Sequence, residues 1–144
     1  MMKKTKKIFA IVLVIINLFL IFSISADALS VSATTSPTGM NILTSNSNLL
    51  LSKSSKITVK CTKGYAMKVT FIKISKCTVK RSTGAGFTAW DSMIVYEGGS
   101  ASFTIKTGAL KNGLVTIKVT PLLGEAIAYT VTGTNTNCIG RTVV

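Results

Sequence analysis

Apolar and polar residues alternate one by one along short segments of this chain, and turn-forming residues separate the segments. The alternation is clear over residues 56–61, 102–107, 114–120 and 126–132. A repeat of two residues places alternate side chains on opposite faces of a β-strand, whereas an amphipathic helix needs a repeat near 3.6. No convincing helical period follows the N-terminal leader. The pattern therefore predicts an all-β protein whose strands recur about every ten residues.

The spacing of these segments favours an antiparallel β-sandwich, immunoglobulin-like or jelly-roll-like, with about seven to eight strands. A small barrel is the alternative. We place the sandwich at residues 48–144, after a Ser/Thr/Asn-rich segment at 29–47 that reads as flexible or as a weak first strand. Between Phe71 and Ile72 the apolar phase shifts by one residue, which predicts a β-bulge.

Two glycine-containing turns predict β-hairpins. One is Glu97–Ser100, which contains a Gly-Gly pair, and the other is Lys111–Gly113, which contains Asn-Gly. The segments 98–105 and 113–120 resemble the closing strands of bacterial immunoglobulin-like surface modules. The Cys–Trp–Cys order of antibody domains is absent, because Trp90 follows both Cys61 and Cys77.

The N-terminus has the order of a secretory signal peptide. Four lysines precede an apolar run from Ile8 to Ile24, and Ala26 and Ala28 form a small-x-small cleavage signal. We predict a signal peptide over residues 1–28. An uncleaved anchor is the alternative, because the apolar run approaches the length that spans a bilayer. Both alternatives deliver the domain outside a bacterial cell, so we expect a secreted or cell-surface protein.

The chain is strongly basic, with 17 Lys and Arg residues against four Asp and Glu and a formal net charge of +13. Four of the cations and one of the acids belong to the leader, so the remaining domain keeps a net charge of about +10. Such a charge indicates a polyanionic partner or surface, or it serves solubility. Most of these cations are lysines, which favour diffuse charge attraction over planar recognition by arginine. An AT-rich genome would produce the same lysine bias.

The residue inventory argues against an enzyme. The chain has no His, and only Asp91, Glu97 and Glu125 supply carboxylates after the leader. Serine or cysteine nucleophiles would therefore lack an imidazole base, and a converging carboxylate pair is not expected. No glycine-rich phosphate loop precedes a helix, and the cysteine spacing matches no zinc pattern. We predict no catalytic residues, no cofactor and no metal site.

Three cysteines remain to be explained, in a compartment that permits disulfides. Cys61 shares the inward phase with Ile57 and Val59, so it is a buried thiol or half of a bridge. A Cys61–Cys77 bridge would close a short loop. Cys138 lies in a polar C-terminal segment, where it would link two chains or fix the tail to the domain. The sequence leaves the three possible pairings open.

Threonine and lysine recur together at outward positions of four predicted strands. The pairs are Thr58 and Lys60, Lys68 and Thr70, Thr104 and Lys106, and Thr116 and Lys118. In a single sheet these residues would form a cationic face suited to an anionic polymer, such as a teichoic acid, an acidic polysaccharide or a nucleic-acid backbone, with salt-sensitive binding. The structural alternative is that threonine favours strands and lysine blocks edge pairing. The few aromatic residues are expected to point inward, which argues against nucleic acid as a partner.

These observations predict a secreted or cell-surface, non-catalytic module that binds the cell envelope, the matrix or another protein. One alternative is a cationic effector that acts on anionic membranes, although the chain lacks a basic amphipathic helix after the leader. Another is a self-assembling fibre subunit, joined through strand edges or Cys138. We expect membrane contact only through an uncleaved leader.

Overall fold

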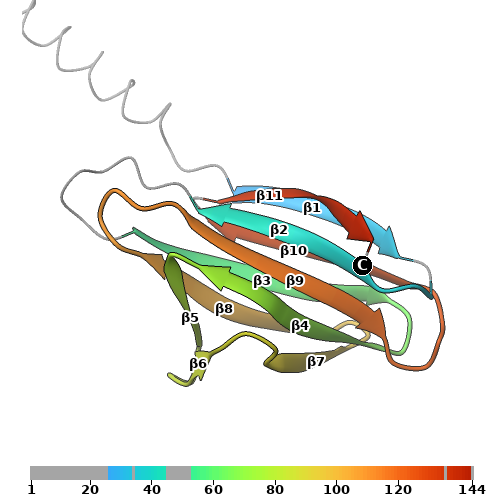
Figure 1. Cartoon of the computed structure of the whole chain (residues 1–144). Helices are drawn as coiled ribbons and strands as arrows, with labels where there is room; N and C mark the ends of the chain where they lie inside the picture. The colour runs from blue at the N-terminus through green and yellow to red at the C-terminus, as the bar shows by residue number, and fades with distance from the viewer. Residues whose placement is uncertain (1–25, 34, 45–52, 135, 144) are drawn as a thin grey trace, which may run out of the picture.

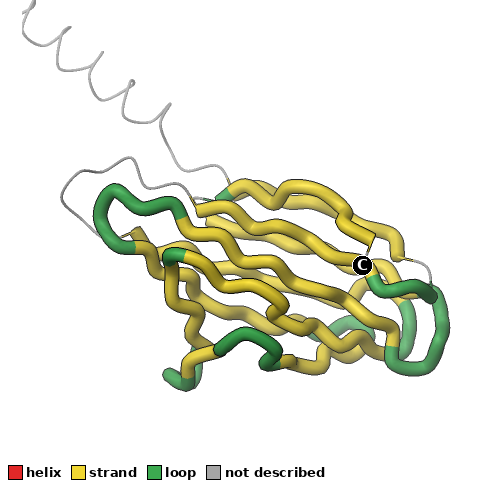
Figure 2. Tube along the Cα trace, viewed as in Figure 1, coloured by secondary structure: helices red, strands yellow, loops and turns green. Residues whose placement is uncertain are grey.

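The computed structural model describes residues 26–33, 35–44, 53–134 and 136–143. These residues form eleven strands and no helix, arranged as two antiparallel sheets packed face to face (Figures 1 and 2). In spatial order, sheet A contains β1 (Ala26–Ala33), β10 (Ile127–Thr134), β3 (Lys53–Lys63), β8 (Ser100–Thr107), β5 (Cys77–Arg81) and β6 (Gly86–Phe87). Sheet B contains β11 (Asn137–Val143), β2 (Thr38–Thr44), β9 (Gly113–Pro121), β4 (Ala66–Ser75) and β7 (Ser92–Tyr96). The predicted all-β sandwich is confirmed, but its described strands number eleven rather than seven or eight.

Most of the extra strands come from segments whose polar composition hid them. Two strands, β1 and β2, occupy the segment predicted to be flexible or a weak first strand. Val31 of β1 and Met40 and Ile42 of β2 are buried, so a few well-spaced apolar side chains pack this polar segment against the core. The polar tail forms β11, which pairs with β2.

The predicted signal peptide, residues 1–28, overlaps the first residues of β1. Residues 1–25 of the predicted leader, and residues 48–52 of the predicted sandwich, lie outside the described residues. Ala26 and Ala28 lie in β1, opposite Thr134 and Thr132 of β10. Cleavage after Ala28 would therefore shorten β1 by three residues.

The predicted bulge is confirmed in β4. The pairing of β4 with β9 shifts between Phe71 and Lys73, which is where the apolar phase of the sequence changes. Inward alternation is also confirmed in β3, where Ile57, Val59 and Cys61 are fully buried.

Both predicted hairpins are wrong, because the chain changes sheet at each turn. Strand β7 pairs with β4 in sheet B, while β8 pairs with β3 and β5 in sheet A. The Gly98 N–H donates to the Cys61 carbonyl at 2.9 Å, so the Gly-Gly turn packs across the end of β3 instead of closing a hairpin. At the second turn, β8 and β9 again belong to different sheets. A type I′ hairpin would require positive φ at the Asn-Gly pair. In this connection the residue with positive φ is Leu110 instead.

The segment 87–96 is rich in strand-forming residues such as Ile94 and Val95, but a turn interrupts it. Its ends form β6 and β7, in different sheets. Between them, Asp91 accepts hydrogen bonds from the Thr88 backbone N–H at 2.7 Å and the Thr88 hydroxyl at 3.0 Å. These bonds hold the pKa of the Asp91 carboxyl below its ordinary value. Trp90 takes a φ of 75° in this turn.

The core lies between the two sheets. Phe71 of sheet B contacts Phe87 and Phe103 of sheet A, with ring centroids 4.4 and 5.0 Å apart. Aromatic pairs of this kind contribute about 0.5–1.5 kcal/mol each beyond the area they bury. A buried hydrogen bond of 3.1 Å joins Tyr129 of β10 to Thr38 of β2, so it also links the two sheets.

Candidate functional site

The eight predicted Thr and Lys positions do not share one sheet. Thr58, Lys60, Thr104 and Lys106 lie on the neighbouring strands β3 and β8 of sheet A, whereas Lys68, Thr70, Thr116 and Lys118 lie on β4 and β9 of sheet B. The two groups therefore face opposite sides of the sandwich. Residue alternation shows which side of a strand faces outward, but not which sheet the strand joins. The prediction from sequence therefore assigned residues of two separate surfaces to a single face.

The outward side of sheet A forms a surface of lysine and hydroxyl side chains, which we call the sheet A face. Its residues on β3, β5, β8 and β10 are Ser54, Lys56, Thr58, Lys60, Thr78, Lys80, Ser100, Ser102, Thr104, Lys106, Thr130 and Thr132, all exposed or half-buried. Pairing aligns them in rows across the sheet. Successive rows are about 7 Å apart, because alternate residues of a strand share a face.

Four exposed lysines are distributed over these rows. Thr130, Lys60 and Ser100 form one row, and Thr132, Thr58 and Ser102 form the next. Lys56, Thr104 and Lys80 follow, and Ser54, Lys106 and Thr78 complete the series. Sequence reasoning missed Lys56 and Lys80. The alternation of β3 contained the signal for Lys56, which shares the phase of Thr58 and Lys60.

The hydroxyl groups between the lysines are partly fixed by hydrogen bonds. The Thr58 and Ser102 hydroxyls lie 2.9 Å apart on neighbouring strands, and the Thr132 hydroxyl donates to the Thr58 carbonyl at 3.5 Å. At the end of β10, the Thr134 hydroxyl accepts from the Lys56 backbone N–H at 3.1 Å. These bonds hold short polar side chains in place on the flat side of a sheet.

Among the described residues, no carboxylate lies at an outward position of β3, β5, β8 or β10, and Asp27 of β1 lies opposite the buried Gly133 of β10. Asp91, Glu97 and Glu125 lie in the connections that follow β6, β7 and β9. The lysines of the face therefore have no carboxylate between them to neutralise their charge, and unbalanced charge of one sign attracts polyanions.

The outward side of sheet B is different. Lys68 and Lys118 lie there with Thr70 and Thr116, and the Thr116 hydroxyl donates to the Asn41 side chain at 2.8 Å. Ile94 and Tyr96 of β7 are 51% and 58% exposed, and the Tyr96 ring contacts that of Tyr65 edge to face. Apolar groups thus interrupt the charges on this side.

The expectation that aromatic residues point inward is wrong for three of them. Trp90 is 74% exposed, and Tyr65 and Tyr96 are more than half exposed. Trp90 lies in the turn after β6, and the two tyrosines lie at the sheet B side of the β3–β4 turn and on β7. None of the three lies among the lysines of the sheet A face.

The cysteines form no disulfide within the described residues. Cys77 pairs with Thr107, which also pairs with Lys53, and Cys61 lies eight residues further along β3. That separation is about 26 Å, so the Cys61–Cys77 bridge is excluded. Cys138 lies half-buried on β11 opposite Ile42 and packs against the core, so it is not in an irregular polar tail.

Burial raises the pKa of both Cys61 and Cys77. The Cys61 sulfur lies 3.6 Å from the Lys63 carbonyl, and the Cys77 sulfur lies 3.8 Å from the Leu114 carbonyl. Both groups are therefore neutral thiols near neutral pH, and neither has the depressed pKa of a nucleophilic cysteine.

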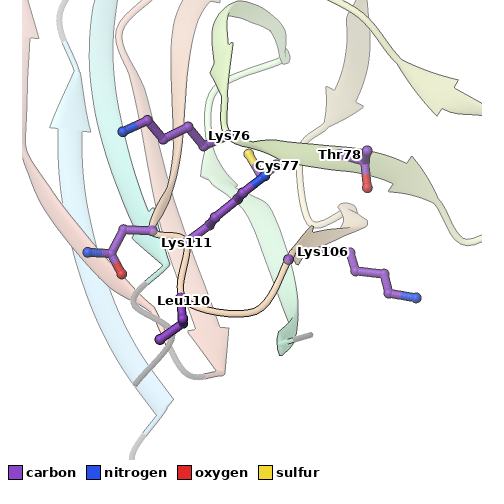
Figure 3. A pocket seen from close by; sticks show the side chains of 8 residues that line it. Lys76, Cys77, Thr78, Lys106, Leu110 and Lys111 are labelled. Atoms are coloured by element: carbon purple, nitrogen blue, oxygen red, sulfur yellow. The ribbon is translucent and has the colours of Figure 1, made fainter. Parts of the chain in front are cut away.

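A pocket of about 610 Å³ opens at the end of the sheet A face. Its walls come from the β4–β5 turn, the start of β5, and the connection from β8 to β9. The lining residues are Lys76, Cys77, Thr78, Lys106, Gly108, Leu110, Lys111 and Asn112 (Figure 3). Thr78 and Lys106 also belong to the last row of the sheet A face, so pocket and face are continuous.

No protein-family model and no curated protein sequence matches this chain. Within the described ranges, no helix is long and apolar enough to cross a membrane. The same residues bring together no group of three or more His, Cys, Asp or Glu side chains that would hold a metal ion.

Proposed function

We propose that this protein is a secreted or cell-surface, non-catalytic β-sandwich module that binds an anionic polymer of the cell envelope through the sheet A face. The observation that carries the proposal is the arrangement of Lys56, Lys60, Lys80 and Lys106 in rows across one sheet, with hydroxyls between them and no carboxylate at the outward strand positions.

The chemistry of the face suits a flexible chain with repeated charges. Lysine attracts anions as a point charge on a long stem, so it tolerates variation in the geometry of the partner better than arginine does. Threonine and serine hydroxyls donate and accept hydrogen bonds, which suits the hydroxyl-rich units of a polyol or a sugar. A teichoic acid or an acidic polysaccharide combines both features.

We further propose that the sandwich is of the jelly-roll type. Eight strands support this assignment, in the order β1-β10-β3-β8 in sheet A and β2-β9-β4-β7 in sheet B. Consecutive members of this set alternate between the sheets except around the β5–β6 insertion, as two interlocked Greek keys do. In such a fold the outward side of a sheet is free to form a broad, flat binding surface.

Sedimentation of the full-length protein with purified bacterial cell walls tests the proposed function. The protein should co-sediment at low salt with walls that retain their anionic polymers, and should stay in the supernatant with walls stripped of those polymers. High salt should release the bound protein, because counterions displaced on binding return to the polymer. Binding that persists on stripped walls, or no binding at low salt, would contradict the proposal.

A further inference from the structure

The pocket at the end of the sheet A face is strongly cationic. Lys76, Lys106 and Lys111 contribute to its lining, Thr78 and Asn112 add polar groups, and no lining residue is acidic. Leu110 supplies an apolar part of the wall. An anionic group with a short carbon chain attached to it meets complementary chemistry in such a site.

The three lysines that line the pocket extend in different directions, and only Lys111 points inward. In Figure 3, Lys111 runs from the β8–β9 connection toward Cys77, while Lys76 and Lys106 extend to opposite sides. Lys111 is therefore placed to meet a group inside the pocket. Lys106 connects the pocket with the charges of the sheet A face, because it lies in the row of Ser54 and Thr78.

The backbone around the pocket is strained. Lys76 and Leu110 have φ values of 57° and 58°, and they are two of the three described non-glycine residues with positive φ. Left-handed backbone is disfavoured for a residue with a side chain, because its Cβ lies too close to the following carbonyl oxygen. Strain of this kind persists where the surrounding structure enforces it, and it concentrates at functional sites.

Cys77, which lines the pocket, does not oppose an anion. Cys77 is a neutral thiol near neutral pH, since burial raises its pKa. Its sulfur faces the Leu114 carbonyl at 3.8 Å, so the thiol proton has an acceptor. Lysine binds a phosphate group as a point charge, so the pocket can hold phosphate without the bidentate geometry that arginine supplies.

We propose that this pocket binds a phosphate group of a phosphodiester-linked polymer, with Lys111 contacting the phosphate inside and Lys106 guiding the chain onto the sheet A face. This inference rests on the proposed function and narrows it, because it names phosphate, rather than carboxylate, as the anion. A polymer held at one end by a pocket and along its length by a face binds at both together, which raises its affinity through effective concentration.

Protection of Cys77 from alkylation tests the proposal directly. The full-length protein would be treated with iodoacetamide, and labelling of each cysteine followed by mass spectrometry. Oligomers of poly(glycerol phosphate) should slow the labelling of Cys77 about ten-fold when present at about ten times their dissociation constant. Cys61 is fully buried and serves as an internal reference for the intact fold.

Two variants and two further probes make the outcome decisive. Lys111→Gln should lose most of the protection, whereas Lys118→Gln on sheet B, which removes the same charge, should keep it. Polygalacturonate at equal charge concentration should protect less than the phosphate oligomer, and inorganic phosphate at matched ionic strength should protect at higher concentration. Equal protection by the carboxylate polymer would overturn the assignment of phosphate.

The remaining outcomes separate the pocket from the face. If poly(glycerol phosphate) binds the protein but leaves Cys77 labelling unchanged, the face is used and the pocket proposal fails. If poly(glycerol phosphate) does not bind while inorganic phosphate still protects Cys77 in a Lys111-dependent manner, the pocket binds free phosphate and the assignment of a phosphodiester-linked polymer fails. The proposed function fails separately, if neither the phosphate polymer nor polygalacturonate binds at low salt. If neither poly(glycerol phosphate) nor inorganic phosphate protects Cys77 from alkylation, the pocket proposal is wrong.

Discussion

Cys61 shows how position in the sandwich changes the chemistry of one side chain. It is fully buried on β3, and burial is the main cause that raises its pKa above the ordinary value of 9.0. In the unfolded chain the same thiol ionises at its ordinary pKa. The proton is therefore held more tightly in the folded state than in the unfolded state.

This difference predicts a pH-dependent stability. The contribution of Cys61 is fully present below the unfolded pKa and is lost as the pH rises from about 9 through the folded pKa, because the unfolded state then releases its proton first. Urea unfolding of the reduced protein at about pH 7.5 and about pH 10 measures the loss. We expect a smaller loss in Cys61→Ala than in the wild type. Cys138→Ala is the control, and an equal loss in all three proteins would refute the assignment.

At this scale the sequence predicted which side chains point inward, but not which surface the outward ones share. The inward phase of Ile57, Val59 and Cys61 is confirmed. Lys60 and Lys118 have the same local pattern, yet they lie on opposite sides of the sandwich. Local alternation carries no information on strand partners, which depend on contacts between residues far apart in the chain.

At the scale of elements, the connections decide the fold. Turn residues marked the ends of several strands, but they did not show the turn between β6 and β7, and both hairpin predictions failed because each turn leads to the other sheet. A glycine permits a reversal of direction without fixing where the next strand lies. The next strand can join either sheet, because each sheet buries one face in the shared core. Packing between the sheets therefore outweighs the local preference of a glycine turn for pairing the strand with the preceding one.

Gly64, in the turn from β3 to β4, provides a test of one such crossing. Its φ is +96°, and an added Cβ would lie 2.7 Å from the Ile127 side chain and 2.9 Å from the Ala126 carbonyl oxygen. Gly64→Ala combines backbone strain with overpacking and should lower the free energy of unfolding by about 3 kcal/mol.

Gly84 is the matched control for this substitution. Its φ of +91° is similar, but an added Cβ would meet nothing within 4 Å. Gly84→Ala should therefore cost only the backbone strain, about 1 kcal/mol. Chemical denaturation measures both values, and equal losses would show that the close approach of Ile127 to Gly64 contributes nothing to this turn.

At the scale of the whole molecule, an unequal distribution of chemistry distinguishes the two sides of the sandwich. Sheet A presents lysines and hydroxyls outward, whereas sheet B adds exposed Ile94 and Tyr96 to its lysines. The net charge of the chain was evident from composition, but its arrangement followed only from the strand order. The proposal of a binding surface on sheet A therefore depends on where the lysines lie in the sandwich, and not on the net charge of the chain.

The salt dependence of polymer binding, compared between two triple variants of equal charge, tests this claim most directly. Lys56→Gln, Lys60→Gln and Lys80→Gln remove three charges from sheet A, and Lys68→Gln, Lys73→Gln and Lys118→Gln remove three from sheet B. The slope of log affinity for poly(glycerol phosphate) against log salt should decrease by about 2 in magnitude for the sheet A variant, taking the value of about 0.7 per phosphate contact that holds for single-stranded nucleic acids. The sheet B variant should keep the wild-type slope, whereas equal slopes for the two variants would contradict a binding surface on sheet A.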